Sequence, residues 1–326
     1  MSQGVFPLSK NSTIVRHMIE AMVRRAAVRA AGWIAPAWTV QRAAEWFITP
    51  PRHRQPARES SALARAQPFQ VQSNGETLQA WRYELSHHPV IIFSHGWGGR
   101  GGQFASWVAA CLAEGYQVIV FDHAAHGASG GRRAPITAFA NGVADVTLAL
   151  EKQGVSIAAF IGHSLGCPAI GMALNGRLKH LRHVKVILVA PPASLIRYSR
   201  FFARTMGLSE RLRAAMQWRL EQRIGLAWKD IELPGAVKHL KVPALIIHDQ
   251  EDQDVRIESG LAVARAWPGA RFKRTIGLGH RRILRDASVI GASLDFLADR
   301  VTFSLPPQPD EWSQAFSALS GRAPIY

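Results

Sequence analysis

Two pentapeptides in the sequence match G-x-S-x-G, a pattern that can hold a nucleophilic serine between two glycines. One spans residues 162–166 (Gly-His-Ser-Leu-Gly) and the other residues 127–131 (Gly-Ala-Ser-Gly-Gly). A serine in this pattern is exposed for chemistry only on a sharp turn that follows a buried strand and opens a helix. The pattern alone is weak, so the neighbouring sequence must decide between the two serines.

Ser164 has the required neighbours. An apolar run at 157–161 precedes it, and a helical pattern at 165–174 follows it. Ser129 has no strand pattern directly before it, and the Arg-Arg-Ala-Pro that follows at 132–135 does not start a helix. The sequence therefore favours Ser164 as the nucleophile.

A serine nucleophile needs a base, and the base needs a carboxylate that orients it. Downstream of Ser164, an apolar strand pattern ending at His248 runs into an acidic loop, whose carboxylates are Asp249, Glu251, Asp252 and Asp254. Further on, Gly-Leu-Gly-His at 277–280 comes directly after the last strand pattern. Loops that follow strands suit side chains that meet in one site, so His280 and one of these carboxylates are candidates.

A glycine-rich stretch at 95–99 (His-Gly-Trp-Gly-Gly) follows another apolar run. An oxyanion hole would use one backbone N–H after the nucleophile and one from the loop after the third strand, which are those of Leu165 and Trp97. Glycines at this density could equally form a plain turn or a phosphate cradle, and the cradle is disfavoured because no Lys-Ser/Thr pair follows them. We expect the substrate pocket to include residues of both motifs, namely His95, Gly96, Trp97 and His163.

The remaining chain alternates between strand and helix patterns. Strands are predicted at 69–71, 78–83, 90–94, 117–121, 156–161, 184–190, 244–248 and 271–275, and helices at 104–114, 138–153, 165–174, 257–267 and 287–299. The first two strands are close enough for an antiparallel start, and the others are separated by helices. The pattern predicts an α/β fold with a mostly parallel, eight-stranded sheet covered by helices on both faces.

Five motifs in order now carry a family resemblance, at 95–99, 121–129, 162–166, 248–255 and 279–280. Over roughly residues 68–300 the sequence resembles the α/β-hydrolases, in particular the lidded esterase and monoacylglycerol-lipase-like (serine-aminopeptidase-type) branch. The resemblance implies Ser164 as nucleophile, Asp252 as the acid of the triad and His280 as the base. The chain departs from the family at Asp249, where a glycine is usual.

This reading divides the chain into three parts. Residues 1–66 form an N-terminal helical extension with a Pro/Arg-rich linker, residues 67–300 the hydrolase domain, and residues 301–326 a C-terminal tail. The long gap at 191–240 is read as a helical lid, because insertions at the carboxyl ends of strands are placed to cover a ligand site.

The resemblance implies hydrolysis of a small-molecule carboxylic ester, including lipid-like acyl esters, through an acyl-enzyme. Fold likeness does not fix the substrate, so hydrolysis of thioesters, amides, peptides or carbon–carbon bonds stays open. A catalytically silent binding protein on the same fold is the alternative class. No cofactor is implied, and no metal site is expected because the two cysteines are isolated and no His-x-x-x-His lies on a helix.

The net charge of +16 invites a nucleic-acid reading. Arginines supply most of that charge and are spread along the whole chain, without zinc-ligand spacing or a basic leucine-zipper register, so no nucleic-acid partner is expected. Two cysteines favour a reducing compartment, and a cytoplasmic protein is the expectation. The basic, amphipathic helix predicted at 14–31 packs against the protein or makes a peripheral membrane contact, and the oligomeric state stays open.

Overall fold

The computed structural model describes residues 10–84 and 88–300, with side chains described from residue 19 onward. The predicted C-terminal tail lies outside the described residues. The chain forms two compact units. Met1–Ile48 and Leu195–Lys229 make the first, here called the helical unit, and Thr49–Ser194 with Asp230–Tyr326 make the second, the sheet unit.

The sheet unit is built on one eight-stranded sheet in the order β1-β2-β4-β3-β5-β6-β7-β8. The strands are β1 Gln67–Ser73, β2 Glu76–Tyr83, β3 Val90–Ser94, β4 Gln117–Phe121, β5 Ile157–His163, β6 Lys185–Val189, β7 Ala244–Asp249 and β8 Arg271–Thr275. Strand β2 is antiparallel to β1 and β4, and all other neighbours are parallel. The predicted fold class is therefore confirmed.

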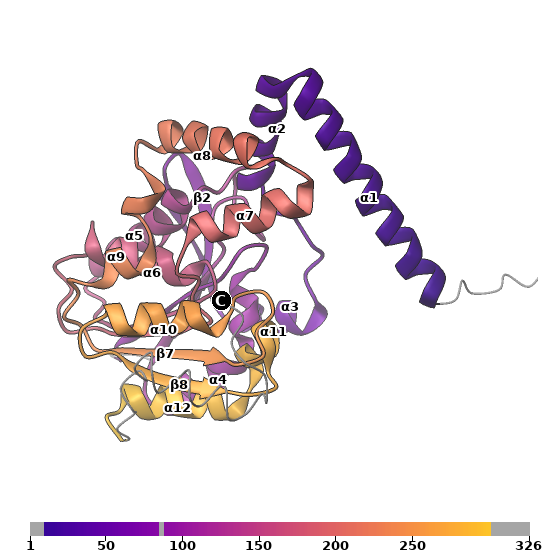
Figure 1. Cartoon of the computed structure of the whole chain (residues 1–326). Helices are drawn as coiled ribbons and strands as arrows, with labels where there is room; N and C mark the ends of the chain where they lie inside the picture. Colours follow the sequence, from indigo (N-terminus) through magenta and orange to yellow (C-terminus); the bar gives the residue numbers. More distant parts are fainter. Residues whose placement is uncertain (1–9, 85–87, 301–326) are drawn as a thin grey trace, which may run out of the picture. The chain divides into compact units, whose positions relative to one another are not determined.

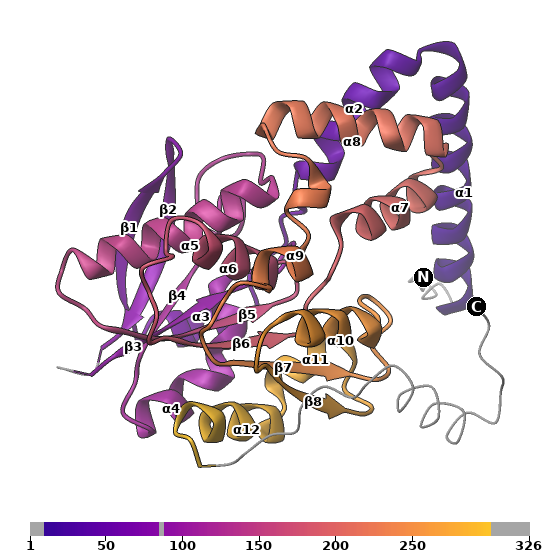
Figure 2. The same ribbon diagram turned by 60° about the vertical axis from the view of Figure 1, so that its left-hand side comes forward.

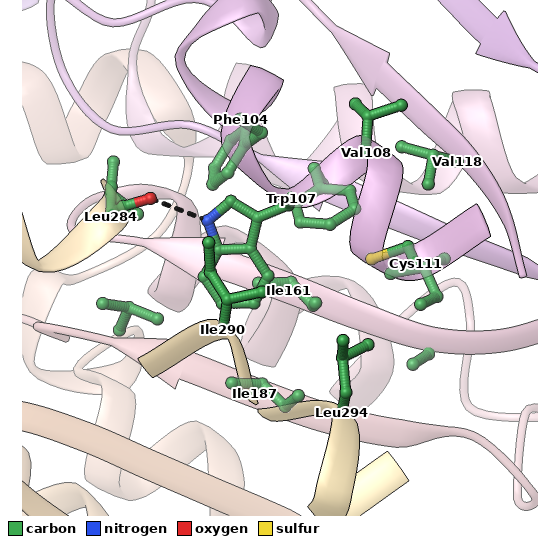
Figure 3. Close-up of a cluster of buried hydrophobic side chains, with 14 of the residues drawn as sticks. Phe104, Trp107, Val108, Cys111, Val118, Ile161, Ile187, Leu284, Ile290 and Leu294 are labelled. Carbon is green, nitrogen blue, oxygen red and sulfur yellow. Dashed lines mark hydrogen bonds between the residues drawn. The ribbon is translucent and has the colours of Figure 1, made fainter. Parts of the chain in front are cut away.

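The central strands are buried on both faces, as their unbroken apolar sequences require. Because side chains alternate along a strand, one set of residues faces each layer of helices. One set joins a core with Trp107 and Cys111 of α4 (Ala105–Ala113) and with Ile290 and Leu294 of α12 (Ala287–Leu297) (Figure 3). There the buried Trp107 indole donates a hydrogen bond to the Leu284 carbonyl at 2.9 Å, so this large side chain leaves no polar atom unpaired.

Helices cover both faces of the sheet. Helices α4 and α12 lie on one face, while α5 (Ile136–Glu151), α6 (Gly166–Asn175) and α10 (Ile257–Ala266) lie on the other (Figures 1 and 2). The short α9 (Leu233–Val237) packs against α6 and α10, and the single turns α11 (Gly279–Arg282), η1 (Gly101–Phe104) and η3 (Ile283–Arg285) complete the unit. Because β3 to β8 run parallel, with helices in the connections, their carboxyl ends lie at one edge of the sheet.

Residues 49–66 belong to the sheet unit, although their composition reads as a linker. Within them, helix α3 (Ala57–Leu63) starts after Pro56, and Leu63 is part of the core. The Tyr83 hydroxyl donates to the Ala62 carbonyl at 2.8 Å, and Arg100 lies 3.3 Å from the buried Glu59 carboxylate. Side-chain contacts with the rest of the sheet unit therefore hold this segment in place. The prolines only prevent it from forming one long helix.

The helical unit contains α1 (Lys10–Ile34), α2 (Pro36–Ile48), α7 (Leu195–Met206), α8 (Glu210–Ile224) and the turn η2 (Trp228–Asp230), of which Asp230 is in the sheet unit. The helix predicted at 14–31 lies within α1, and α7 and α8 lie within the segment 191–240 that the sequence indicates as helical, whereas α2 was not predicted. Phe47 of α2 anchors the unit, with its ring 5.5 Å from Tyr198, 5.2 Å from Phe202 and 5.3 Å from Trp228. No helix in the described part of the chain has the length and apolar character needed to cross a membrane.

Candidate active site

Ser164 sits on a sharp turn between β5 and α6. Its φ of 51° is in the left-handed region, which a serine adopts only when its surroundings impose it. Its N–H donates to the Val189 carbonyl of the neighbouring strand at 3.0 Å. A Cβ at Gly166 would overlap the Ser94 carbonyl oxygen, so only glycine lets α6 start this close to the end of β3. The turn therefore holds Ser164 half-buried at the edge of the sheet.

The glycine-rich loop after β3 passes directly against this turn. A Cβ at Gly96 would lie 2.7 Å from the Ser164 Cβ and 3.3 Å from its Oγ. The next residue, Trp97, and Leu165 after the serine are both half-buried. Within residues 10–84 and 88–300, neither of their backbone N–H groups has a hydrogen-bond acceptor in the protein. Two N–H groups flanking a serine in this way can bind a negatively charged oxygen.

Asp252 and His280 meet although they come from different loops. His280 Nδ1 donates to Asp252 Oδ2 at 2.7 Å, and the carboxylate is buried while the ring stays half-buried. The other carboxylate oxygen, Oδ1, accepts from the N–H groups of Asp254 at 2.9 Å and Val255 at 2.8 Å. Asp254 and Glu251, its neighbours in the acidic loop, are exposed to solvent.

The surroundings of Asp252 keep it ionised. Burial by itself would raise its pKa, but His248, His280 and backbone N–H groups stabilise the carboxylate and hold the pKa well below its usual range. His248 lies 3.6 Å from Oδ2, and its Nε2 donates to the Val255 carbonyl at 2.7 Å. The negative charge of Asp252, which accepts from Nδ1–H, fixes the tautomer of His280 so that its Nε2 carries a lone pair that can accept a proton.

His163, next to the serine, holds the backbone of His280. Its Nε2 donates to the His280 carbonyl at 2.9 Å, and the two rings are 4.8 Å apart. Burial lowers the pKa of His163 to about 3, so the ring stays neutral and keeps this role. Among the described residues the Ser164 hydroxyl has no hydrogen-bond partner, so the structure joins Asp252 to His280 but does not show a bond between His280 and Ser164.

Three buried histidines support the glycine-rich loop. His126 Nε2 accepts from the Gly98 N–H at 3.1 Å, and His95 Nδ1 donates to the Gly96 carbonyl at 2.8 Å. His123 Nε2 lies 2.9 Å from Ser94 Oγ, and its ring stacks on Phe139 at 4.1 Å. His95 has no exposed surface, so its side chain can act on a ligand only through the loop that it holds.

The second G-x-S-x-G pentapeptide has a structural place. Ser129 is buried; its Oγ donates to the Asp122 carbonyl at 2.6 Å and accepts from the Gln79 N–H at 2.8 Å. The Asp122 carboxylate accepts from the N–H groups of Gly101 and Ala128, both at 2.7 Å. Both Ser129 bonds join its loop to backbone, so this hydroxyl is already used in holding the loop after β4.

Asp249 fixes the position of the loop that carries His280. Its side chain is fully buried and accepts from Thr275 Oγ1 at 2.7 Å, from the Leu278 N–H at 3.0 Å and from the Glu251 N–H at 3.0 Å. Burial would raise its pKa, but these donors and the Gly279 N–H lower it. The aspartate that replaces the family's usual glycine thus joins the acidic loop to the histidine loop.

Sequence reasoning missed the supporting roles of Asp249, Asp122 and His126. Asp122 and His126 lie in a matched motif, and Asp249 was visible as a departure from the family, so each carried a signal. Their bonds join segments far apart in sequence, which spacing does not reveal. As for a metal, the described residues contain no group of three or more His, Cys, Asp or Glu side chains that could hold one.

Comparison with known proteins agrees with this architecture. Residues 86–232, somewhat less than half of the chain, match the family described as "Serine aminopeptidase, S33". A Klebsiella pneumoniae protein, named "Putative carbamate hydrolase RutD", is 35% identical over 88 residues, which are 26% of this chain and 32% of that protein. The chain thus matches about a third of the length of this curated relative.

Solved structures match over more of the chain. An esterase of Pyrococcus furiosus, Pf2001, has a TM-score of 0.60 at 18% identity and covers 77% of this chain and 99% of its own. Est1E of Butyrivibrio proteoclasticus, solved with ferulic acid bound, has a TM-score of 0.58 at 16% identity and covers 71% and 97%. At such identities the likeness shows a shared fold.

Proposed function

We propose that the chain is an α/β-hydrolase and, within that superfamily, a serine hydrolase that cleaves carboxylic esters. The observation that carries the proposal is the 2.7 Å bond from His280 Nδ1 to the buried, ionised Asp252, in a loop whose backbone is held by the neighbour of Ser164. A histidine oriented in this way beside a strained serine is the arrangement that nucleophilic acyl transfer requires.

In the proposed reaction Ser164 Oγ attacks the ester carbonyl carbon while its proton passes to His280 Nε2. The carbonyl oxygen becomes negatively charged and is bound by the N–H groups of Trp97 and Leu165. The tetrahedral intermediate collapses, the C–O bond to the alcohol breaks, and His280 returns the proton to the leaving alcohol. Water, deprotonated by the same nitrogen, then attacks the acyl carbon. The bond from that carbon to Ser164 Oγ breaks, His280 returns the proton to Oγ, and the acid is released.

The missing bond between Ser164 and His280 is compatible with this role. Catalytic hydrogen bonds are often long before substrate binds and shorten in the reacting complex. The roles proposed for Asp252 and for the two N–H groups do not depend on that bond, because they are supported by burial and backbone geometry.

Two structural neighbours favour esters as substrates. Pf2001 is an esterase, and Est1E was solved with ferulic acid, a carboxylic acid, bound to it. The name of RutD favours carbamates as a second candidate, since a carbamate also reacts at its carbonyl carbon. Thioesters, amides, peptides and carbon–carbon bonds remain further substrates of the same chemistry, and a silent binding protein is the alternative class.

Labelling with a fluorophosphonate probe tests the nucleophile. The native chain should react, Ser164→Ala should lose both labelling and ester turnover, and Ser129→Ala should keep labelling in the fraction that folds. Failure of the folded native protein to label, or labelling that survives Ser164→Ala, would contradict the proposal.

The leaving group is tested separately with nitrophenyl esters of increasing acyl length, the matching nitroanilides and a nitrophenyl carbamate. Ester turnover should exceed anilide turnover by a large factor. Faster turnover of the carbamate than of every ester would favour the second candidate, and labelling without turnover of any substrate would leave the ester assignment wrong.

A further inference from the structure

Helix α1 carries an apolar stripe on the side that faces away from its own unit. At 100° per residue, the exposed apolar side chains described on this helix gather on one broad face, and they are Ile19, Met22, Val23, Ala26, Ala27, Ala30, Trp33 and Ile34. On the opposite side Val28 is buried, and a Cβ at Gly32 would lie 2.6 Å from the Leu212 side chain of α8. The helix therefore packs on its unit through one face and presents a second apolar face that is largely exposed.

The exposure of this stripe is large. Trp33 is 90% exposed, Ile34 84%, Met22 66% and Val23 63%. Single exposed apolar residues are ordinary, but a continuous patch on one face marks a surface that binds something. Among the described residues, every large exposed apolar side chain other than Ile276 lies in the helical unit.

The same unit carries most of the net charge of the chain. Its sequence has fourteen Lys and Arg against four Asp and Glu, a net charge of +10 out of +16. Two of those four carboxylates pair with arginines of α8, Glu45 with Arg223 at 3.2 Å and Glu210 with Arg213 at 2.8 Å. On α1 itself, exposed Arg29 borders one edge of the apolar stripe and exposed Glu20 the other, and exposed Arg24 and Arg25 lie further round on either side.

We propose that α1 docks on an anionic lipid surface. A helix lying in the plane of a bilayer buries its apolar face at the level of the head groups, while arginines at its sides reach the lipid phosphates. Trp33 suits that depth because its ring is apolar and its N–H remains able to donate. The helical unit, with its net charge of +10, is attracted to anionic lipid. A second copy of the chain carries the same charge and would be repelled, so the charge favours a lipid surface as the partner.

Vesicle co-sedimentation of the full chain tests the proposal without depending on catalysis. Vesicles of phosphatidylcholine alone are compared with vesicles that also contain phosphatidylglycerol, at low and at high salt. We expect binding to the anionic vesicles, weakened by salt. Trp33→Ser/Ile34→Ser should lower the partition coefficient at least about tenfold. Arg24→Gln/Arg25→Gln/Arg29→Gln should lower it by about a hundredfold, from the loss of three charges near the surface.

The matched control is Trp218→Ser on α8, where an exposed tryptophan (62%) lies outside the stripe. It should leave binding within about twofold of the native protein, given that its ring is not on the docking face. All the altered side chains are exposed, and unchanged thermal unfolding would show that each variant folds. Equal binding of the stripe variant and the native chain, no preference for anionic vesicles, or a native oligomer that the stripe variant dissociates would each overturn the proposal.

Discussion

At the scale of single residues, the proposed role of His280 as the base depends on the orientation of its ring. Asp252 supplies the charge that holds Nδ1–H, with its own pKa kept low by the groups around it. Asp252→Asn keeps the shape but removes that charge and favours the wrong tautomer, so kcat should fall by roughly 10³–10⁴. Ester kinetics and unfolding curves would be measured together, and a loss under tenfold in a folded variant would assign the acid to another residue.

Asp249 acts one step further from the reacting atoms. It accepts from Thr275, Leu278 and Glu251, and an asparagine would turn an NH₂ group toward at least one of these donors. The loop before His280 would loosen while the contacts to substrate remain, so Asp249→Asn should lower kcat roughly 10–100-fold with little change in KM. We propose Asp249 as a positioning residue on this ground.

Asp254→Asn is the control, because Asp254 is an exposed acid of the same loop and its change should cost less than about threefold. If both variants lose kcat equally, the negative charge of the loop matters and the hydrogen bonds of Asp249 do not. A KM that rises while kcat stays constant would place Asp249 in substrate binding.

At the scale of elements, the closeness of α6 to β3 depends on one missing methyl group. A Cβ at Gly166 would overlap the Ser94 carbonyl, so Gly166→Ala should push the helix away and destabilise the protein by roughly 3 kcal/mol or more. Fluorophosphonate labelling should fall with it, since Ser164 is fixed by the same turn.

Gly291→Ala on α12 tests the same substitution where space is open. Nothing lies within 4 Å of a Cβ at that position, and alanine is the better helix former, so the variant should be more stable by roughly 0.5–1 kcal/mol. Denaturant unfolding of the pair separates steric conflict from helix propensity. A Gly166→Ala variant that is at least as stable as the native protein would mean that the turn between β5 and α6 tolerates a Cβ.

The elements also show what the sequence could predict. The strands and most helices follow from apolar runs and from helical periodicity, and β3, β4 and β8 match their predicted bounds. Helix α3 was not predicted, because Pro50, Pro51 and Pro56 indicate a linker. Prolines often stand at the start of a helix, however, and Pro56 directly precedes α3. Candidate site residues at strand ends were predictable because that edge is shared. The bonds of Asp249 and His126 were not, since they depend on loop conformations set by tertiary packing.

At the scale of the whole molecule, several titratable side chains are buried in the sheet unit. His95, His123, His126 and His163 are buried, and burial lowers all four pKa values, to about 4 for His126 and about 3 for His163. Burial raises the pKa of Asp122 to about 6, the opposite direction. These shifts link the stability of the fold to pH, because the unfolded chain binds protons that the folded chain does not.

The sign follows from comparing the two states. Each histidine is neutral in the fold but takes a proton in the unfolded chain below its ordinary value of 6.5, so its contribution is complete above 6.5 and is lost as pH falls toward its folded value. Asp122 opposes this, because its folded form holds a proton up to pH about 6. Because four histidines outweigh one carboxyl, the free energy of unfolding should decrease by roughly 3–4 kcal/mol for each unit that the pH is lowered near pH 5.5.

Urea unfolding at pH 7, 6 and 5 measures this slope directly. His126→Gln keeps an acceptor for Gly98 while removing one titrating group, so in a folded variant the slope should be shallower by roughly 1 kcal/mol per pH unit. His183→Gln, a change of an exposed histidine, should leave it unaltered. Stability that stays constant from pH 7 to 5 would mean that the buried rings take up protons in the folded protein, with the charge stabilised by water or by a carboxylate, and would contradict the prediction.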